Sequence, residues 1–170
     1  SMGFNATIWV SPFVNVDADN FDGLLRKRII VKRKDGEGAA LMRWWHGEAG
    51  IVDFSSARGR EWYGERLRAL AELGFDGFKI DGGDGKYQPD HQEADLENPM
   101  PASEFCDAYL RVFDEHLPEL TESRNGWRTQ DLGIIYREGG KDSHWGEDNG
   151  LKALVRLGLH LSLMGFPWVL

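Results

Sequence analysis

The sequence predicts an α/β fold built on a parallel sheet, and three observations lead to this class. Segments with strand and helix patterns alternate along the chain at the spacing of right-handed β–α–β crossovers. Residues 76–81 have the pattern of a strand that ends in an acidic residue and a run of glycines, which is typical of the carboxyl edge of parallel barrels. The chain holds about five strand patterns and about three good helix patterns, too few for a closed barrel of eight strands.

Composition and charge narrow the class of protein. The 170 residues are 41% hydrophobic and 12% aromatic, which suits one globular domain with a core. The formal net charge of −8 disfavours a non-specific nucleic-acid binder, because such a protein needs a basic face. The longest apolar stretch, residues 151–170, contains charged residues, glycine and proline, so no membrane-spanning segment is expected. Cys106 is the only cysteine, which excludes an internal disulfide and leaves the compartment undetermined.

The N-terminal part of the chain predicts a strand, a polar loop and a basic segment. Residues 6–14 have the composition of a buried strand, which we expect to end near Pro12 because proline cannot donate to a sheet. Residues 15–20 form a polar loop whose carboxylates lack the further ligands of a calcium loop, so a solvated loop is favoured over a metal site. Residues 21–34 are basic and amphipathic, and a solvated face is favoured there over a phosphate site.

Two adjacent tryptophans mark the extended segment 41–46, which follows a glycine-rich turn. Neighbouring side chains of an extended chain point to opposite faces, so Trp44 and Trp45 cannot both belong to one flat core. One of them is therefore a candidate platform for stacking on the C–H face of a sugar ring. The alternative, that both are core residues, stays open because tryptophan is often buried.

A helix and the central strand follow. Residues 51–54 predict a short strand, Ser55 or Ser56 is a candidate N-cap, and apolar residues recur at helical spacing over residues 57–73. In the central strand, residues 76–81, the two-residue alternation places the charged side chains on the face opposite to the apolar ones. A charged face on such a strand is costly to bury without a purpose, so its last residue is the first functional candidate.

The second half of the chain predicts a long loop and four further elements. The proline- and acid-rich loop over residues 87–101 is long enough to be a functional lid or rim. A helix over residues 151–163 is apolar nearly all round and is therefore expected to be buried. The other predicted elements are a helix that opens at Ser103 and Glu104 and runs to Leu117, a strand over residues 133–136, and a last strand over residues 166–170.

Polar residues after the predicted strands provide the candidate chemistry. Asp81, Arg137 and the turn that contains Asp148 would meet at one mouth of a parallel barrel. Two carboxylates facing a cavity are what glycoside hydrolysis requires, one to attack the anomeric carbon and one to protonate the leaving oxygen. Asp81 suits the nucleophile because a nearby cation, Lys79, keeps a carboxylate ionised. Asp148 suits the acid because an apolar neighbour such as Trp145 favours the protonated form.

Spacing disfavours other kinds of site. Residues 81–85 lack the alternate oxygen ligands of an EF-hand, and the sequence contains no nucleotide-binding glycine loop. The five histidines lack metal-ligand spacing, and His116 and His160 are interpreted as structural helix residues. For each Asp–Gly-rich motif taken alone, a plain turn stays open as the alternative.

Taken in order, five motifs resemble glycoside hydrolase family 31. The likeness covers nearly the whole chain and is to the branch of myogenesis-regulating glycosidases, whose relatives look like α-galactosidases. The family also holds α-glucosidases, α-xylosidases and sulfoquinovosidases. The five motifs are Ile8–Asn15, Arg43–Gly47, Val52–Ser55, Gly77–Asp84 and Trp145–Gly150.

The resemblance implies a partial (β/α)₈ TIM barrel and a retaining double displacement, with neither a metal nor an organic cofactor. By the family's order the chain would hold roughly strands three to seven of the barrel. Residues 1–2 then resemble an expression scar, and residues 3–170 form the central part of the catalytic barrel. The family's nucleophile falls on Asp81 and its acid/base on Asp148, so their carboxyl groups are expected roughly 5–7 Å apart.

The resemblance also implies a sugar pocket. Arg137 falls on an arginine that donates hydrogen bonds to substrate hydroxyls, and Asp84 stands where relatives usually carry glutamate, which implies a reshaped subsite. The implied substrate is a terminal α-galactoside as first choice and an α-glucoside as second. The residues expected to bind it are Trp44, Trp45, Lys79, Asp84, Arg137 and Trp145.

The rival interpretation is an inactive, truncated barrel piece that only binds sugar or self-assembles. The intact pair of Asp81 and Asp148 favours catalytic ancestry. A piece of a barrel leaves two strand edges with unpaired backbone groups, so we expect the isolated chain to self-associate through them. The expected edges are residues 7–10 and 168–170.

Overall fold

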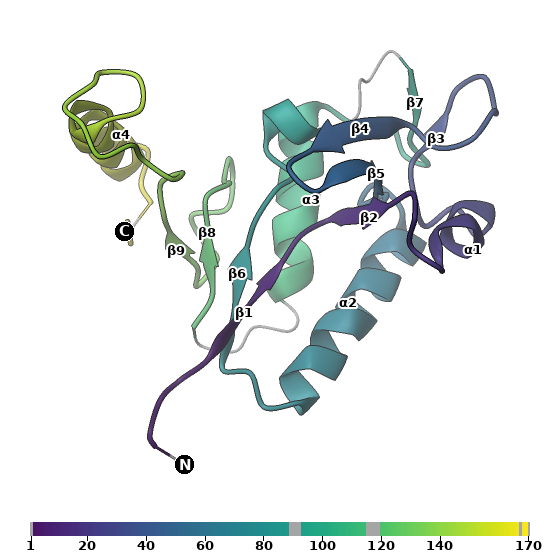
Figure 1. Ribbon diagram of the computed structural model, residues 1–170, viewed down its shortest axis with the longest axis horizontal. Helices are drawn as coiled ribbons and strands as arrows, with labels where there is room; N and C mark the ends of the chain where they lie inside the picture. Colours follow the sequence, from purple (N-terminus) through teal and green to yellow (C-terminus); the bar gives the residue numbers. More distant parts are fainter. Residues whose placement is uncertain (1, 89–92, 115–119, 167, 170) are drawn as a thin grey trace.

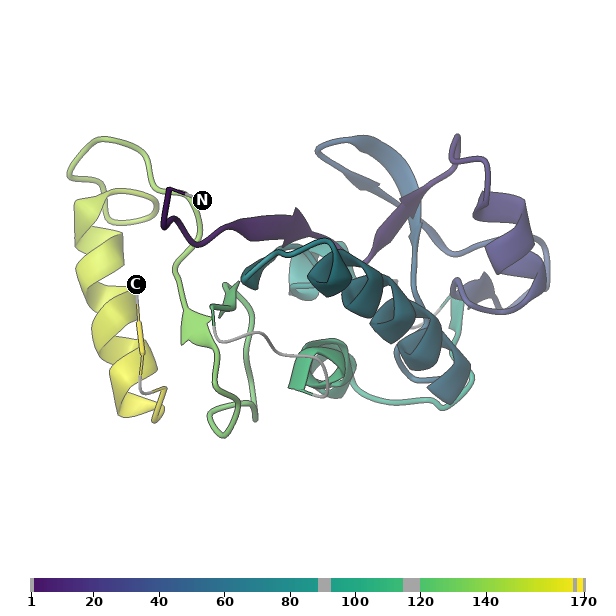
Figure 2. The ribbon, with the colours of Figure 1, turned by 90° about the horizontal axis from the view of Figure 1, so that it is seen from below.

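A short parallel sheet runs through the middle of the molecule (Figure 1). Helices α2 (Ala57–Glu72) and α3 (Ala102–Asp114) lie on one side of it, whereas α4 (Leu151–Leu163) lies apart at the opposite end of the molecule (Figures 1 and 2). This arrangement confirms the predicted α/β class with a parallel sheet. The computed structural model describes residues 2–88, 93–114, 120–166, 168 and 169.

The parallel sheet is open and has four strands. In spatial order they are β1 (Thr7–Val10), β6 (Gly77–Ile80), β8 (Glu122–Ser123) and β9 (Ile135–Tyr136). β1 pairs with β6 along its whole length, and an isolated parallel bridge places Val169 beside Tyr136. β1 is an edge of this sheet, as predicted, and the described strands do not close into a barrel. The predicted strand over residues 133–136 is confirmed at its second half, whereas β8 was not predicted.

Helices α2 and α3 cover one face of the sheet and form the core with it. Phe78 and Ile80 of β6 are fully buried, while Lys79 points away from the core, as the two-residue alternation predicted. The Ser56 hydroxyl accepts a hydrogen bond from the backbone N–H of Gly59 at 2.9 Å, which confirms the predicted N-cap of α2. The buried aromatic side chains between the helices and the sheet are Phe54, Tyr63, Phe78, Phe105, Tyr109 and Phe113.

The predicted single strand over residues 6–14 is wrong, because the chain changes sheet at Ser11 and Pro12. β1 ends at Val10, and β2 (Phe13–Asn15) joins an antiparallel sheet with β5 (Gly47–Ile51) and β4 (Leu41–Trp44). The proline nitrogen carries no hydrogen to donate to the parallel ladder, whereas its carbonyl accepts from Val52 N–H at 3.0 Å. Of the strand predicted at residues 51–54, only Ile51 lies in β5, which is antiparallel, and Val52 forms an isolated antiparallel bridge with Ile30.

Two short segments complete this antiparallel unit. Helix α1 (Phe21–Arg26) covers only the start of the predicted basic segment, and β3 (Lys32–Arg33) pairs with β7 (Ala94–Asp95). The basic side chains on α1 and β3 face outward, while the residues between them, Ile29, Ile30 and Val31, are buried.

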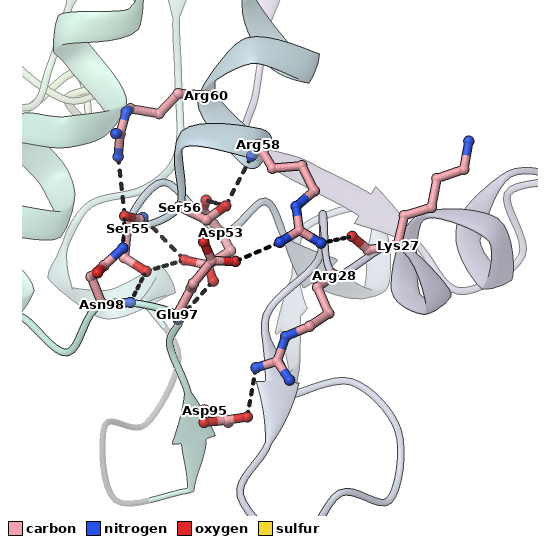
Figure 3. A network of polar contacts seen from close by, with 11 residues as sticks. Lys27, Arg28, Asp53, Ser55, Ser56, Arg58, Arg60, Asp95, Glu97 and Asn98 are labelled. Atoms are coloured by element: carbon pink, nitrogen blue, oxygen red, sulfur yellow. Dashed lines mark hydrogen bonds and ion pairs between the residues drawn. The ribbon is translucent and has the colours of Figure 1, made fainter.

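The second part of the predicted lid, residues 93–98, is fastened to the start of α2 (Figure 3). The buried Asp53 carboxylate accepts from the backbone N–H of Glu97 at 3.1 Å, and from the Ser55 hydroxyl at 2.6 Å. Ser55 Oγ in turn accepts from the N–H of Asn98 at 3.1 Å. These bonds make residues 93–98 a structural connection rather than a lid. A single 3₁₀ turn, η1 (Gly85–Tyr87), begins the loop, and residues 89–92 lie outside the described residues.

Helix α4 forms as predicted, but the expectation that it is buried is wrong. Ala153 is its one buried residue, whereas Leu159 is 63% exposed and Leu163 is 86% exposed. An apolar sequence predicts burial only if another element lies against it, and in this structure the helix stands at the end of the molecule (Figure 2). The expected helix end at Leu117, the expected strand end at Leu170 and the helix residue His116 lie outside the described residues.

Within the part of the chain that the structure describes, every helix is too short or too polar to cross a membrane.

Candidate active site

Charged side chains gather on the face of the parallel sheet that the helices leave uncovered. Lys79 lies on β6 and Glu122 on β8, and both project away from the core. Asp81, Arg124 and Arg137 each follow directly on the carboxyl end of β6, β8 or β9. Since parallel strands bring their carboxyl ends to one edge, residues far apart in sequence meet there. We call these five residues the Asp81 cluster.

Asp81 is the most heavily contacted member of the cluster. Its Oδ1 forms ion pairs with Arg124 Nε at 2.8 Å and Arg137 Nη2 at 3.4 Å, and it accepts from Gly82 N–H at 3.1 Å. Its Oδ2 accepts from the indole N–H of Trp9 at 2.9 Å. The side chain of Asp81 is 16% exposed, so it is held within the protein but is reachable from solvent.

The predicted pairing of Asp81 with Lys79 is wrong. Lys79 Nζ lies 3.5 Å from Glu122 Oε1, and Arg137 Nε contacts the same oxygen at 3.1 Å. Among the described residues, the cations that form ion pairs with Asp81 are therefore the two arginines, and Lys79 pairs with Glu122 instead. Arg137 is placed at Asp81 as predicted.

The turn after Asp81 requires glycine. Gly82 and Gly83 both have positive φ, +73° and +76°, a conformation that residues with a Cβ rarely adopt. A Cβ on Gly82 would lie 2.5 Å from the ring of Phe13, and one on Gly83 would lie 2.9 Å from the ring of Tyr109. The double glycine thus lets the chain turn between packed aromatic rings and brings Asp84 back toward Asp81.

Asp84 is linked to Asp81 through a shared arginine. Arg124 Nη2 lies 3.1 Å from Asp84 Oδ2, while Nε of the same guanidinium contacts Asp81. Burial raises the pKa of Asp84, the charges of Arg124 and Lys86 lower it, and the nearby Asp81 raises it. Asp84 is therefore a half-buried carboxyl whose charge is balanced mainly by Arg124.

An aromatic cluster stands beside these charges. The expectation that Trp44 and Trp45 point to opposite faces is wrong, because β4 ends at Trp44 and their ring centroids lie only 5.0 Å apart. Trp9 stacks on Trp44 with centroids 6.2 Å apart and planes 6° apart. The guanidinium carbon of Arg124 lies 5.5 Å from the ring centroid of Trp45, which joins the aromatic cluster to the Asp81 cluster. The aromatic cluster consists of Trp9, Phe13, Trp44, Trp45, His46 and Tyr87.

The Asp148 loop, residues 138–150, lies outside both clusters. Asp148 is exposed, and its Oδ1 accepts from the N–H of Asn149 at 2.9 Å. Trp145 is 72% exposed, and neither residue has a hydrogen bond or ion pair to Asp81 among the described residues. Glu147 pairs with Lys152 and Arg156 on α4. The structure thus brings together Asp81, Asp84, Arg137 and the two tryptophans, but not Asp148 and Trp145.

Sequence reasoning missed three residues of this site. Trp9 was assigned to a buried strand, yet its side chain lies on the uncovered face with its N–H on Asp81. Glu122 lies in β8 and Arg124 directly follows it, and the two residues of this strand are too few to show an alternation. The regular succession of strands and helices was the available signal, since a strand was due between α3 and β9.

No group of three or more His, Cys, Asp or Glu side chains that could hold a metal ion occurs in the described ranges. The candidate site is therefore described by its carboxylates, arginines and aromatic rings.

Known proteins resemble this chain in sequence and in fold. Residues 1–169 match the glycosyl hydrolases family 31 TIM-barrel domain. The chain belongs to glycoside hydrolase family 31. It is 31% identical over 169 residues to the myogenesis-regulating glycosidase of Mus musculus, covering 99% of this chain and 23% of that protein.

Solved structures of family 31 proteins superpose on most of the chain. A sulfoquinovosidase of this family from E. rectale matches with a TM-score of 0.84 at 17% identity, over 96% of this chain and 26% of that one. The cycloalternan-degrading enzyme from Trueperella pyogenes, in complex with a covalent intermediate, matches with a TM-score of 0.70 at 25% identity, over 84% of this chain and 22% of that one. The 170 residues thus span about a quarter of the length of these family 31 proteins.

Proposed function

We propose that this chain carries the nucleophile and much of the sugar pocket of a retaining α-glycosidase, which hydrolyses terminal non-reducing α-glycosidic bonds. The observation that carries the proposal is Asp81, a carboxylate at the end of a parallel strand, contacted by Arg124 and Arg137 and flanked by an aromatic cluster. Family membership supports the same reaction class.

In the proposed first step, an oxygen of Asp81 attacks the anomeric carbon of the terminal sugar. The bond from that carbon to the leaving oxygen breaks, its electron pair goes to the leaving oxygen, and Asp148 supplies the proton. In the second step water attacks the same carbon, Asp81 leaves, and Asp148 takes the proton of the water. The two displacements retain the configuration. A covalent intermediate in the related cycloalternan-degrading enzyme supports this route.

Asp148 must approach Asp81 for this route. We propose that the catalytic form places their carboxyl groups roughly 5–7 Å apart. The Asp148 loop is bonded mainly to itself and to α4, by contacts such as Asp142 N–H to the carbonyl of Asn149 at 2.8 Å. These contacts join the Asp148 loop to its neighbours in sequence rather than to the sheet, which supports the proposal that the loop can move toward Asp81.

We place the chain at roughly strands three to seven of a (β/α)₈ barrel. The four parallel strands, the open edge at β1 and the bridge at Val169 support this placement. The uncovered face of the sheet then faces the barrel interior, which is where the Asp81 cluster lies. Residues 3–170 are accordingly proposed as the central part of the catalytic domain.

The proposed substrate is an α-galactoside as first choice and an α-glucoside as second. The pocket would be lined by the aromatic cluster on one side and by Asp84 and Arg137 on the other. Lys79 is a weaker candidate for substrate contact than Arg137. Its ammonium pairs with Glu122, and both of these residues lie within their strands rather than at the carboxyl ends, where Asp81 stands.

A panel of aryl α-glycosides tests this proposal. The longest protein that carries this chain is incubated with 4-nitrophenyl α-galactoside, α-glucoside and α-xyloside, and the anomer first released is determined by NMR. Cleavage with release of the α-anomer is expected. Release of the β-anomer would overturn the retaining mechanism, and preference for the xyloside would overturn the choice of galactose. Sugar binding without turnover of any glycoside would favour the rival interpretation, an inactive barrel piece.

A further inference from the structure

Arg124 lies at the point where three parts of the proposed site meet. Its Nε pairs with Asp81 and its Nη2 with Asp84, and the face of its guanidinium lies over the ring of Trp45. Asp81 directly follows β6, Asp84 follows the double glycine, and Trp45 directly follows β4. A planar guanidinium is suited to this, because it presents N–H groups in a fixed plane and a face that packs on an aromatic ring.

The contacts of Asp81 are unequal between its two oxygens. Oδ1 is contacted by Arg124, by Arg137 and by the N–H of Gly82, whereas the one contact of Oδ2 among the described residues is the indole N–H of Trp9. Each oxygen accepts one hydrogen bond, but both guanidiniums form their ion pairs with Oδ1, so Oδ1 lies against two positive charges and Oδ2 lies against neither. Positive charge beside an oxygen lowers its tendency to donate an electron pair to carbon, which favours Oδ2 as the attacking oxygen.

We infer that Arg124 is a positioning residue that, together with Arg137, holds Oδ1 of Asp81 so that Oδ2 is the oxygen that attacks the anomeric carbon. The inference rests on the proposed function and names a residue and an atom within it. The Oδ2–carbon bond forms as the bond to the leaving oxygen breaks, and the electron pair and the proton go to that oxygen as described above.

Arg124 and Arg137 hold Asp81 in different ways. Arg137 also forms an ion pair with Glu122 at 3.1 Å, so a residue within the parallel sheet holds it in place. Arg124 is held by Asp84 and Trp45, so it is held from the pocket side. Loss of Arg124 would leave Asp81 free to rotate about its side chain toward Arg137, which moves Oδ2 away from the sugar. A misplacement of about 1 Å costs on the order of 10²-fold in rate.

The test compares Arg124→Met and Arg124→Lys with a matched control, Arg111→Met. Arg111 also pairs with an aspartate, Asp131 at 3.0 Å, but it lies on α3 away from both clusters. Turnover of a 4-nitrophenyl α-glycoside is measured in the longest protein that carries this chain. Each rate is divided by the amount of enzyme that an epoxide of the matching cyclitol labels at Asp81, quantified by mass spectrometry, so that unfolded protein is not counted.

The expected result is a fall in kcat and not in substrate affinity. Because the contacts of Arg124 to Asp81, Asp84 and Trp45 position the nucleophile, kcat per labelled site should fall about 10²-fold in Arg124→Met while KM changes little. Arg124→Lys keeps the charge but not the planar fork and should fall about 10-fold. Arg111→Met should stay within about twofold of the wild type, as surface substitutions do.

Three outcomes would overturn the inference. Unchanged kcat per labelled site in Arg124→Met would show that Arg137 alone positions Asp81, with the proposed function intact. A raised KM at unchanged kcat would make Arg124 a substrate-binding residue. A wild type that neither cleaves glycosides nor becomes labelled at Asp81 would overturn the proposed function and the inference together. Should Arg124→Met fail to fold, the Lys variant decides by the same criteria.

Discussion

The Asp81 cluster and the Asp148 loop hold their carboxylates in different ways. Asp81 is contacted by Trp9, Arg124 and Arg137, which are far from it in sequence and reach it only because four strands align. Asp148 is bonded to the next residue, and its loop is bonded to itself and to α4. One carboxylate is thus placed by the tertiary fold of this chain, whereas the other is placed by local structure. Two residues with roles in one proposed reaction can therefore differ in how firmly the same chain holds them.

The largest effect on turnover is expected for a substitution of Asp81, the carboxylate that the tertiary fold positions. Asp81→Asn keeps the shape of the side chain but removes the nucleophile, so turnover of aryl α-glycosides should fall by roughly 10⁴-fold or more. Circular dichroism should show an unchanged helix and strand content. Residual turnover within tenfold of the wild type would mean that another group attacks the sugar.

A smaller and substrate-dependent effect is expected in the Asp148 loop. Asp148→Ala removes the proton donor, so cleavage of methyl α-glycosides should fall by about 10²- to 10⁴-fold. Cleavage of 4-nitrophenyl α-glycosides should fall less, because a good leaving group needs little proton assistance. Since Asp148 is exposed, the thermal unfolding midpoint should not change. Equal losses for both substrate types would assign Asp148 another role.

A substitution at Trp9 tests how much the hydrogen bond from the uncharged indole to Asp81 contributes to kcat/KM. Trp9→Phe keeps an aromatic ring beside Trp44 but removes the N–H that Asp81 Oδ2 accepts. A hydrogen bond to a charged group contributes about 1.5–3 kcal/mol, so kcat/KM should fall by roughly 10- to 100-fold. Trp62→Phe, on α2, is the control and should leave kcat/KM unchanged. A Trp9→Phe enzyme with wild-type kcat/KM would show that the indole N–H does not position Asp81.

The comparison of two regions also applies to self-association, for which the edge strand β1 and the apolar surface of α4 are two candidate contact surfaces. The isolated chain should self-associate in light scattering, as predicted from its edge strands. The structure adds a second apolar surface on α4, so the two sources can be separated by substitution. Thr7→Pro blocks the edge at β1, whereas Leu159→Glu places a charge on α4. If the edge is responsible, Thr7→Pro should lower the apparent mass and Leu159→Glu should not. A monomeric wild type would contradict the prediction altogether.

The smallest effect concerns stability and pH at Asp84. Burial raises its pKa above 3.8, so the folded state binds the proton more tightly than the unfolded state does. This contribution to the free energy of unfolding is fully present below pH 3.8 and is lost as the pH rises through the folded pKa. Urea unfolding at several pH values above 3.8 should show the wild type losing stability relative to Asp84→Asn as the pH rises. A constant difference between the two proteins would mean that Asp84 does not titrate in this range.

Local patterns in the sequence predicted the elements that local chemistry determines. Ser56 and the apolar spacing predicted α2, and the alternation around Lys79 predicted which face of β6 is charged. Asp81 could be selected because its strand and its glycine turn are contiguous in sequence. The same reasoning failed wherever the partner is distant. The pairing of Lys79 with Glu122 crosses strands, and the burial of α4 depends on what lies against it. The divided first strand was missed because Pro12 ends one ladder without showing that β2 joins another sheet.

The bonds that fasten residues 97 and 98 have a consequence for sequence tolerance. Asp53 and the Ser55 hydroxyl receive backbone N–H groups, which every residue except proline possesses. Position 97 can therefore vary widely without loosening this connection, and its carboxylate is needed only for an exposed pair with Arg58. Asp53 and Ser55 have no such freedom, because they are buried and their side chains supply the acceptors. Among homologous chains that keep this connection, substitutions should accumulate at position 97 while positions 53 and 55 remain unchanged, although the residues face one another across the same bonds.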